Sequence, residues 1–148
     1  MNQPNQSVAP STDVAFMPGE MTPGMLLLFY QEPLNIHRAY IQLCDSVSAA
    51  LYLTYVGYAS ESPDALANEG WFARTEKEWG ELTGLTRDEQ VNARKRLRNL
   101  GVIEEVRRGM PCRLWQRINM SRLSEHMNEM AEKLYGDALD TYREGSLG

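Results

Sequence analysis

The sequence predicts a mainly α-helical α+β fold with one small β-hairpin and an extra C-terminal helix. Two Thr-x-x-Glu patterns, Thr75 to Glu78 and Thr86 to Glu89, mark the starts of two consecutive helices. After Gly101 the apolar residues change from helical to alternating spacing, which is typical of strands. Helical spacing returns between Ser121 and Tyr142. These three observations predict a helix pair, a hairpin and a long final helix, in that order.

Length and composition exclude several classes of protein. A chain of 148 residues with 43% hydrophobic and 24% charged residues suits one soluble domain. No run approaches the roughly 18 apolar residues of a membrane helix, and no basic segment precedes an apolar one at the N-terminus. We therefore expect a cytoplasmic protein without a membrane partner. Cys44 and Cys112 are far apart and are interpreted as reduced thiols.

The N-terminal segment differs in composition from the remainder. Residues 1–24 contain four of the seven prolines among many Asn, Gln, Ser and Thr residues, which predicts a disordered arm. Residues 25–120 are predicted to form the folded domain, and residues 121–148 an amphipathic helix and tail. Within the domain, the apolar run Met25–Tyr30 is interpreted as a strand or a docking segment.

Local signals divide the domain into elements. A short helix is expected over residues 35–43, and Ser46 is a suitable N-cap for a central helix that reaches Tyr58. Residues 60–70 are expected to be a loop and residues 71–74 a short strand. Gly84 suits a positive φ between the two capped helices, and Gly101 should end the second one. Strands are expected at Val102–Val106 and Leu114–Ile118, joined by a turn over residues 107–111.

This order of helix, tight turn, helix, strand, basic turn and strand is that of a winged helix-turn-helix. The second capped helix, Thr86 to Leu100, separates into two faces. Its predicted core face contains Leu85, Ala93, Leu97 and Leu100, with Gln90 on the same side. Its outward positions are Arg87, Asp88, Val91, Asn92, Lys95, Arg98 and Asn99. Arg94 lies at the boundary, either as a phosphate contact or as a member of a structural ion pair.

The charges are segregated along the chain. Between Leu85 and Arg117 there are nine basic and four acidic residues, a net charge of +5. The total is −5, so the remaining residues carry −10. A basic surface on an acidic body fits a protein that binds duplex DNA in a restricted orientation, whereas the total charge argues against a general nucleic-acid coat.

Residues 34–120 resemble the winged-helix domains of replication-initiator and replisome-organiser proteins of phages, plasmids and integrative elements. The matching stretches are Gly70–Phe72, Thr75–Trp79, Thr83–Gln90, Arg94 with Leu97, Leu100–Ile103, Gly109–Pro111 and Leu114–Asn119. Ser46–Ser60 resembles the aromatic-bearing core helix of that family. The resemblance implies the winged-helix fold and duplex binding in a mobile element. No ATPase, primase or helicase-loading domain follows, so a small transcriptional or copy-control regulator is an equal alternative to an initiator.

The expected function is therefore sequence-specific binding of double-stranded DNA, in transcriptional regulation or in replication and copy control. Arginine pairs with guanine and asparagine with adenine in the major groove, which favours Arg87, Asn92 and Lys95 as base contacts. Phosphate contacts are expected from Arg98, Arg108 and Arg113, with Arg108 at the tip of the hairpin. Gln90 is expected to form hydrogen bonds within the motif, with Arg94 as a suggested partner. The alternative is a winged-helix adaptor or inhibitor that contacts only proteins.

The final helix has two interpretations. Its apolar stripe either packs on its own domain or pairs with a second copy, which would place two reading helices about 34 Å apart on DNA. We expect a homodimer formed through Leu123, Met127, Met130 and Leu134. A replication or regulatory protein is a further expected partner.

Signals of catalysis are missing from the sequence. His37, His126 and the two cysteines stand singly, so no metal site, nucleophile–base pair or cofactor is expected. Gly101 and Gly109 suit a helix stop and a turn instead of a phosphate loop. The three tryptophans are interpreted as core or hairpin anchors, with Trp115 as an alternative base-stacking residue. We therefore expect a protein that is not an enzyme.

Overall fold

The computed structural model describes residues 19–30 and 33–146. Contacts divide the chain into two units, residues 1–34 and residues 35–148. The first unit contains helix α1, Pro23–Tyr30. The run expected as a strand or docking segment is thus helical, and the boundary falls after Leu34 instead of after residue 24. Most of the expected disordered arm lies outside the described residues.

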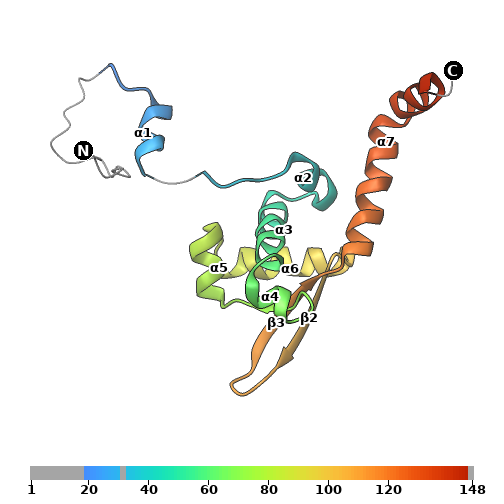
Figure 1. The fold of residues 1–148 in the computed structure, drawn as a ribbon. Helices are drawn as coiled ribbons and strands as arrows, with labels where there is room; N and C mark the ends of the chain where they lie inside the picture. The colour runs from blue at the N-terminus through green and yellow to red at the C-terminus, as the bar shows by residue number, and fades with distance from the viewer. Residues whose placement is uncertain (1–18, 31–32, 147–148) are drawn as a thin grey trace, which may run out of the picture. The chain divides into compact units, whose positions relative to one another are not determined.

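The second unit is mainly helical and contains a small three-stranded antiparallel sheet (Figure 1). The predicted α+β class is therefore confirmed. Its elements in chain order are α2 (Arg38–Cys44), α3 (Val47–Ser60), α4 (Pro63–Ala67), β1 (Phe72–Ala73), α5 (Glu76–Thr83), α6 (Arg87–Leu100), β2 (Ile103–Arg108), β3 (Arg113–Ile118) and α7 (Met120–Ser146). The expected loop over residues 60–70 is corrected, because α4 occupies part of it. Among the described residues, no helix has the length and apolar character needed to cross a membrane.

The sheet has the order β1-β3-β2, so the chain's third strand lies in the middle. Phe72 pairs with Gln116 across β1 and β3, while Glu105 pairs with Gln116 across β2 and β3. Successive side chains of a strand point to opposite faces. Ile103, Glu105 and Arg107 therefore share the face of the hairpin that packs toward α3 and α6. The distal part of the hairpin projects beyond the helices (Figure 1).

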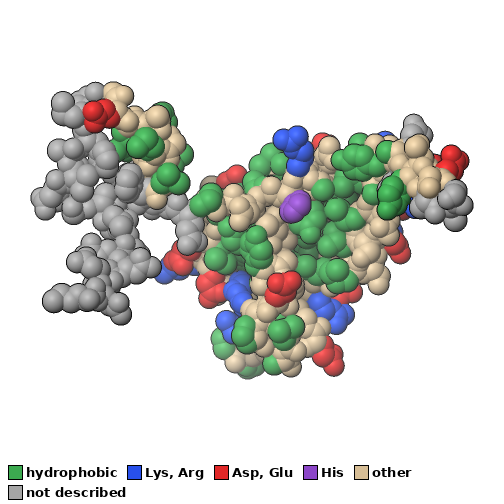
Figure 2. All heavy atoms as spheres, turned by 45° about the horizontal axis from the view of Figure 1, so that its top comes forward, with side chains coloured by type: hydrophobic (Ala, Val, Ile, Leu, Met, Phe, Trp, Pro, Cys, Tyr) green, Lys and Arg blue, Asp and Glu red, His purple; other side chains and the backbone are tan. Residues whose placement is uncertain are grey.

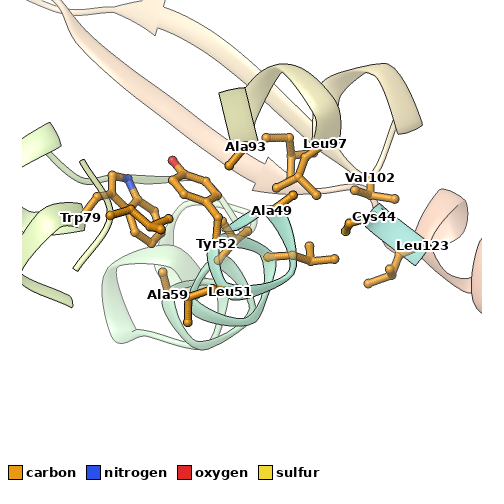
Figure 3. Packing of buried hydrophobic residues seen from close by; sticks show 14 of the residues in the cluster. Cys44, Ala49, Leu51, Tyr52, Ala59, Trp79, Ala93, Leu97, Val102 and Leu123 are labelled. Carbon is orange, nitrogen blue, oxygen red and sulfur yellow. The ribbon is translucent and has the colours of Figure 1, made fainter. Parts of the chain in front are cut away.

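Helix α3 is the centre of the core. Tyr52, Leu53 and Val56 are fully buried, because α3 contacts α2, α5, α6 and β3 around its circumference. Figure 3 shows Tyr52 between Trp79 on one side and Ala93 and Leu97 of α6 on the other. The Tyr52 and Trp79 ring centroids are 4.5 Å apart. Ser46 caps α3 by accepting a hydrogen bond from Ala49 N, as predicted.

Helix α7 begins on this core. Leu123 is only 6% exposed and Met127 packs against the same buried cluster. A ring nitrogen of His126 lies 2.8 Å from the Leu100 carbonyl oxygen. Leu123 and Met127 thus belong to the domain itself, which corrects their expected place in a dimer interface. Met130 is half-buried, whereas Leu134, farther along, is exposed.

Candidate nucleic-acid interface

Local hydrogen bonds define the starts of both α5 and α6. Thr75 Oγ1 accepts from Glu78 N at 3.1 Å, and Thr75 N donates to Glu78 Oε2 at 3.2 Å. Thr86 and Glu89 form the same reciprocal pair at 3.3 and 3.0 Å. Both predicted capping boxes are therefore confirmed. Each pair satisfies two backbone N–H groups that a helix start leaves without partners.

Gln90 fixes the start of α6 against α5. Its buried side-chain amide donates to the carbonyl oxygens of Glu76 and Leu85, both at 3.1 Å. One of these carbonyls lies in the first turn of α5 and the other in the connection between the helices. The prediction that Gln90 bonds within the motif is confirmed, but its partners are these backbone carbonyls instead of the suggested Arg94.

The connection between the two helices requires glycine at residue 84. Gly84 has φ +74° and ends α5, as predicted. A Cβ at this position would meet no atom within 4 Å, so only the backbone conformation opposes a side chain. We expect Gly84→Ala to lower the free energy of unfolding by about 1–2 kcal/mol, because L-residues disfavour this region. Urea denaturation measures the effect, and Gly57→Ala within α3 is the control. An unchanged or increased stability of Gly84→Ala would contradict the prediction.

The outward face of α6 exposes three of the predicted site residues, Arg87, Asn92 and Lys95. The Arg87 side chain is 76% exposed, and its Nε lies 3.6 Å from a Glu76 carboxylate oxygen. The Lys95 side chain forms no hydrogen bond or ion pair with any described residue. Leu85, Ala93 and Leu97 are buried on the opposite side and Leu100 is partly buried, so the predicted division of faces is confirmed.

Two other arginines of α6 converge on one carboxylate. Glu105 of β2 is only 6% exposed, and it accepts from Arg94 Nε at 2.8 Å. Arg98 also pairs with Glu105, and Gln116 Nε2 donates to the same carboxylate at 2.8 Å. Gln116 continues the network to the Tyr52 hydroxyl at 2.9 Å. The network thus joins α6 to both strands of the hairpin and to the central helix α3.

The electrostatics of Glu105 follow from these contacts. Burial alone would raise the pKa of Glu105, but hydrogen bonds from Arg94 and Arg98 outweigh it and hold the pKa below its ordinary value. Burial would likewise lower the pKa of Arg94, and Glu105 reverses this effect. Glu105 is therefore ionised at neutral pH. Of the two roles left open for Arg94, the structure shows the structural ion pair. Arg98, predicted as a phosphate contact, has its charge directed at Glu105 instead.

The opposite face of the hairpin carries arginines stacked on tryptophans. The Arg108 guanidinium carbon lies 4.6 Å from the centre of the Trp115 ring and 5.6 Å from that of Trp71. Arg117 lies 4.6 Å from the Trp71 ring centre and pairs with Glu104 at 2.8 Å. The stacks hold Arg108 in place without neutralising it. Arg113, opposite Arg108 in the strand register, is exposed.

A hollow lies between the first half of α6, the start of α5 and the hairpin. Its volume is about 270 Å³. Five arginines line it, but only one acidic residue, Glu76. The arginines are Arg74, Arg87, Arg94, Arg107 and Arg113. Arg74 and Arg107 were not among the predicted site residues, because neither lies on the outward face of α6. The alternation of β2, which places Arg107 on the same face as Ile103, is the signal that identifies it.

One other face of the second unit is largely uncharged. Figure 2 looks onto the side of α2 and α7, where hydrophobic and uncharged side chains cover most of the visible surface.

Throughout the described part of the chain, no three His, Cys, Asp or Glu side chains gather as a metal site would require. Cys44 is buried and Cys112 is exposed, and both are free thiols.

Comparisons of the chain with protein families, with curated proteins and with solved structures gave no match.

Proposed function

We propose that this protein binds double-stranded DNA sequence-specifically, with α6 in the major groove and the β2–β3 hairpin as a wing on the adjoining backbone. The order of helices and strands and the sheet order β1-β3-β2 support a winged helix-turn-helix. The resemblance of residues 34–120 extends the proposal to transcriptional or copy control in a mobile element. Such a role requires neither a cofactor nor catalysis.

One observation carries the proposal: α6 is held rigidly by its buried side and exposes cationic and amide side chains on the other. The B-DNA major groove admits a single α-helix and presents acceptors to arginine and lysine. Arg87, Asn92 and Lys95 stand at the exposed positions of α6. The Gln90 hydrogen bonds and the Glu105 network fix α6 relative to α5 and the hairpin, so the groups can enter the groove in one orientation.

The hairpin supplies the backbone contacts in this proposal. Arg108 and Arg113 lie at the distal end of the β2–β3 ladder, and neither pairs with a carboxylate among the described residues. Phosphate contacts position a protein on DNA, whereas base contacts specify the sequence. We assign Arg108 and Arg113 to the first role and Asn92 to the second. Arg94 and Arg98 hold α6 against the hairpin through their ion pairs with Glu105.

The test separates these two roles. Bound fragments are selected from random duplex DNA at two salt concentrations, and affinities are then measured for the preferred and for unrelated sequences. Arg108→Gln is expected to weaken binding to all sequences and to reduce the slope of log K against log salt by about one. Asn92→Ala is expected to lose about 1–3 kcal/mol for the preferred sequence only. Arg38→Gln on α2 is the charge-matched control.

A selection that yields no preferred sequence would contradict sequence-specific recognition. Equal losses from Arg38→Gln and Arg108→Gln would contradict the assignment of the interface to α6 and the hairpin, because Arg38 belongs to another helix.

A further inference from the structure

We propose that the arginine-lined hollow between α5, α6 and the hairpin is a binding site for a phosphate group. The site does not depend on the reading of bases by α6. The DNA backbone and small phosphorylated solutes both carry phosphate groups. The experiment below shows which of these two ligands occupies the hollow.

The charge of the hollow is the first support. Arg74 is tied to Asp64 at 3.0 Å and Arg94 to Glu105 at 2.8 Å, so these two guanidinium groups are held in place. The side chains of Arg107 and Arg113 form neither a hydrogen bond nor an ion pair with any described residue. Positive charges gathered in a concave site produce a strong positive potential there, which favours the binding of an anion.

The shape and chemistry of the hollow favour phosphate among anions. Guanidinium groups are planar and donate in pairs, which matches the oxygens of a phosphate. A volume of about 270 Å³ far exceeds the roughly 10–15 Å³ that one water molecule needs, so a phosphate group and part of its hydration shell can enter.

A buried donor in the wall of the hollow gives an independent indication. Trp79 lines the hollow and is only 2% exposed, and its indole nitrogen has no hydrogen-bond partner. The indole N–H is a donor only, and buried donors are nearly always satisfied. In Figure 3 this nitrogen and the Tyr52 hydroxyl lie on the same side of the two stacked rings. Because Trp79 belongs to the wall of the hollow, its indole resonance is a reporter of the site.

The experiment uses the full chain, labelled with ¹⁵N, and inorganic pyrophosphate as the probe. Sodium chloride keeps the ionic strength constant during the titration, and Trp79→Phe assigns the indole signal. We expect a saturable shift of the Trp79 indole and of the Arg107 amide. Arg107→Gln is expected to raise the Kd about tenfold or more, because it removes a charge-assisted hydrogen bond. Arg38→Gln, an equal loss of charge on α2, is expected to leave the Kd within about twofold.

Shifts that do not saturate, or an equal loss of affinity in Arg107→Gln and Arg38→Gln, would overturn the proposal. A repeat titration with random-sequence duplex DNA identifies the source of the phosphate. Competition by the duplex means that the DNA backbone occupies the hollow, and unchanged pyrophosphate affinity means that a small phosphorylated solute does. A protein that binds pyrophosphate but no duplex would refute the DNA-binding proposal and leave the phosphate site intact.

Discussion

Glu105→Ala is expected to lower the free energy of unfolding by about 3–5 kcal/mol, the range for breaking a buried ion pair by removal of one partner. The Arg94 side chain is only 18% exposed, so the substitution leaves a largely buried cation without its carboxylate. Gln116 loses an acceptor at the same time. Urea denaturation followed by circular dichroism measures the change.

Glu104→Ala is the matched control in the neighbouring position of β2. The Glu104 side chain is 40% exposed and pairs with Arg117 on the solvent side of the hairpin. Exposed pairs contribute little, so the control is expected to lose less than about 1 kcal/mol. If the two alanine variants lose equal stability, the Glu105 network does not hold α6 on the hairpin.

The same carboxylate gives the stability a pH dependence. The folded-state pKa of Glu105 lies below its ordinary value of 4.5, so ionised Glu105 stabilises the fold above that pH. This contribution is lost as the pH falls below 4.5 and through the folded-state pKa. Glu105→Ala should therefore show a smaller fall in stability between neutral and acidic pH than the unsubstituted protein. An unchanged acid dependence would contradict the assignment.

Reversing two charges on α6, in Arg87→Glu with Lys95→Glu, is expected to weaken DNA binding at least about a hundredfold. Each change removes a favourable contact worth about 1–3 kcal/mol and adds repulsion from phosphate. Both side chains are exposed, so the fold should be retained. Fluorescence anisotropy with the selected duplex measures the affinity, and Arg38→Glu with Lys133→Glu is the matched control.

The same variant separates DNA binding from the alternative function, a winged-helix adaptor or inhibitor that contacts only proteins. That alternative predicts that the reversal on α6 leaves biological function intact, while changes to exposed residues of α7, such as Leu134, abolish it. Retention of DNA affinity in the α6 variant would refute the proposed interface.

Local features of the fold were predictable because they depend on neighbouring residues. The capping boxes need only Thr and Glu three positions apart, and the ends of α5 and α6 need only Gly84 and Gly101. Long-range pairings have no such signal. Glu105 meets Arg94 because β2 folds back beside α6, and nothing in the sequence between them specifies that approach. The sequence therefore overstated the unpaired positive charge of α6, because Arg94 and Arg98 both pair with Glu105.

The final helix illustrates a different limit. An apolar stripe has the same spacing whether it covers its own domain or a second copy. Leu123 and Met127 pack inside the domain because α7 follows β3 and contacts α2, and only the assembled fold defines this contact. Arg107 was not predicted because the expected strand ended at Val106 and the turn was expected to begin at Arg107, whereas β2 continues to Arg108.

The double hydrogen bond of Gln90 also makes the α5–α6 junction depend on a single amide nitrogen. The side chain holds α5 and α6 together only because its nitrogen carries two protons for two carbonyl oxygens. Deamidation would keep the shape of the side chain but replace that nitrogen with a negatively charged oxygen, which repels both carbonyls. Damage to one amide could therefore loosen the α5–α6 junction while leaving every apolar contact of the core in place.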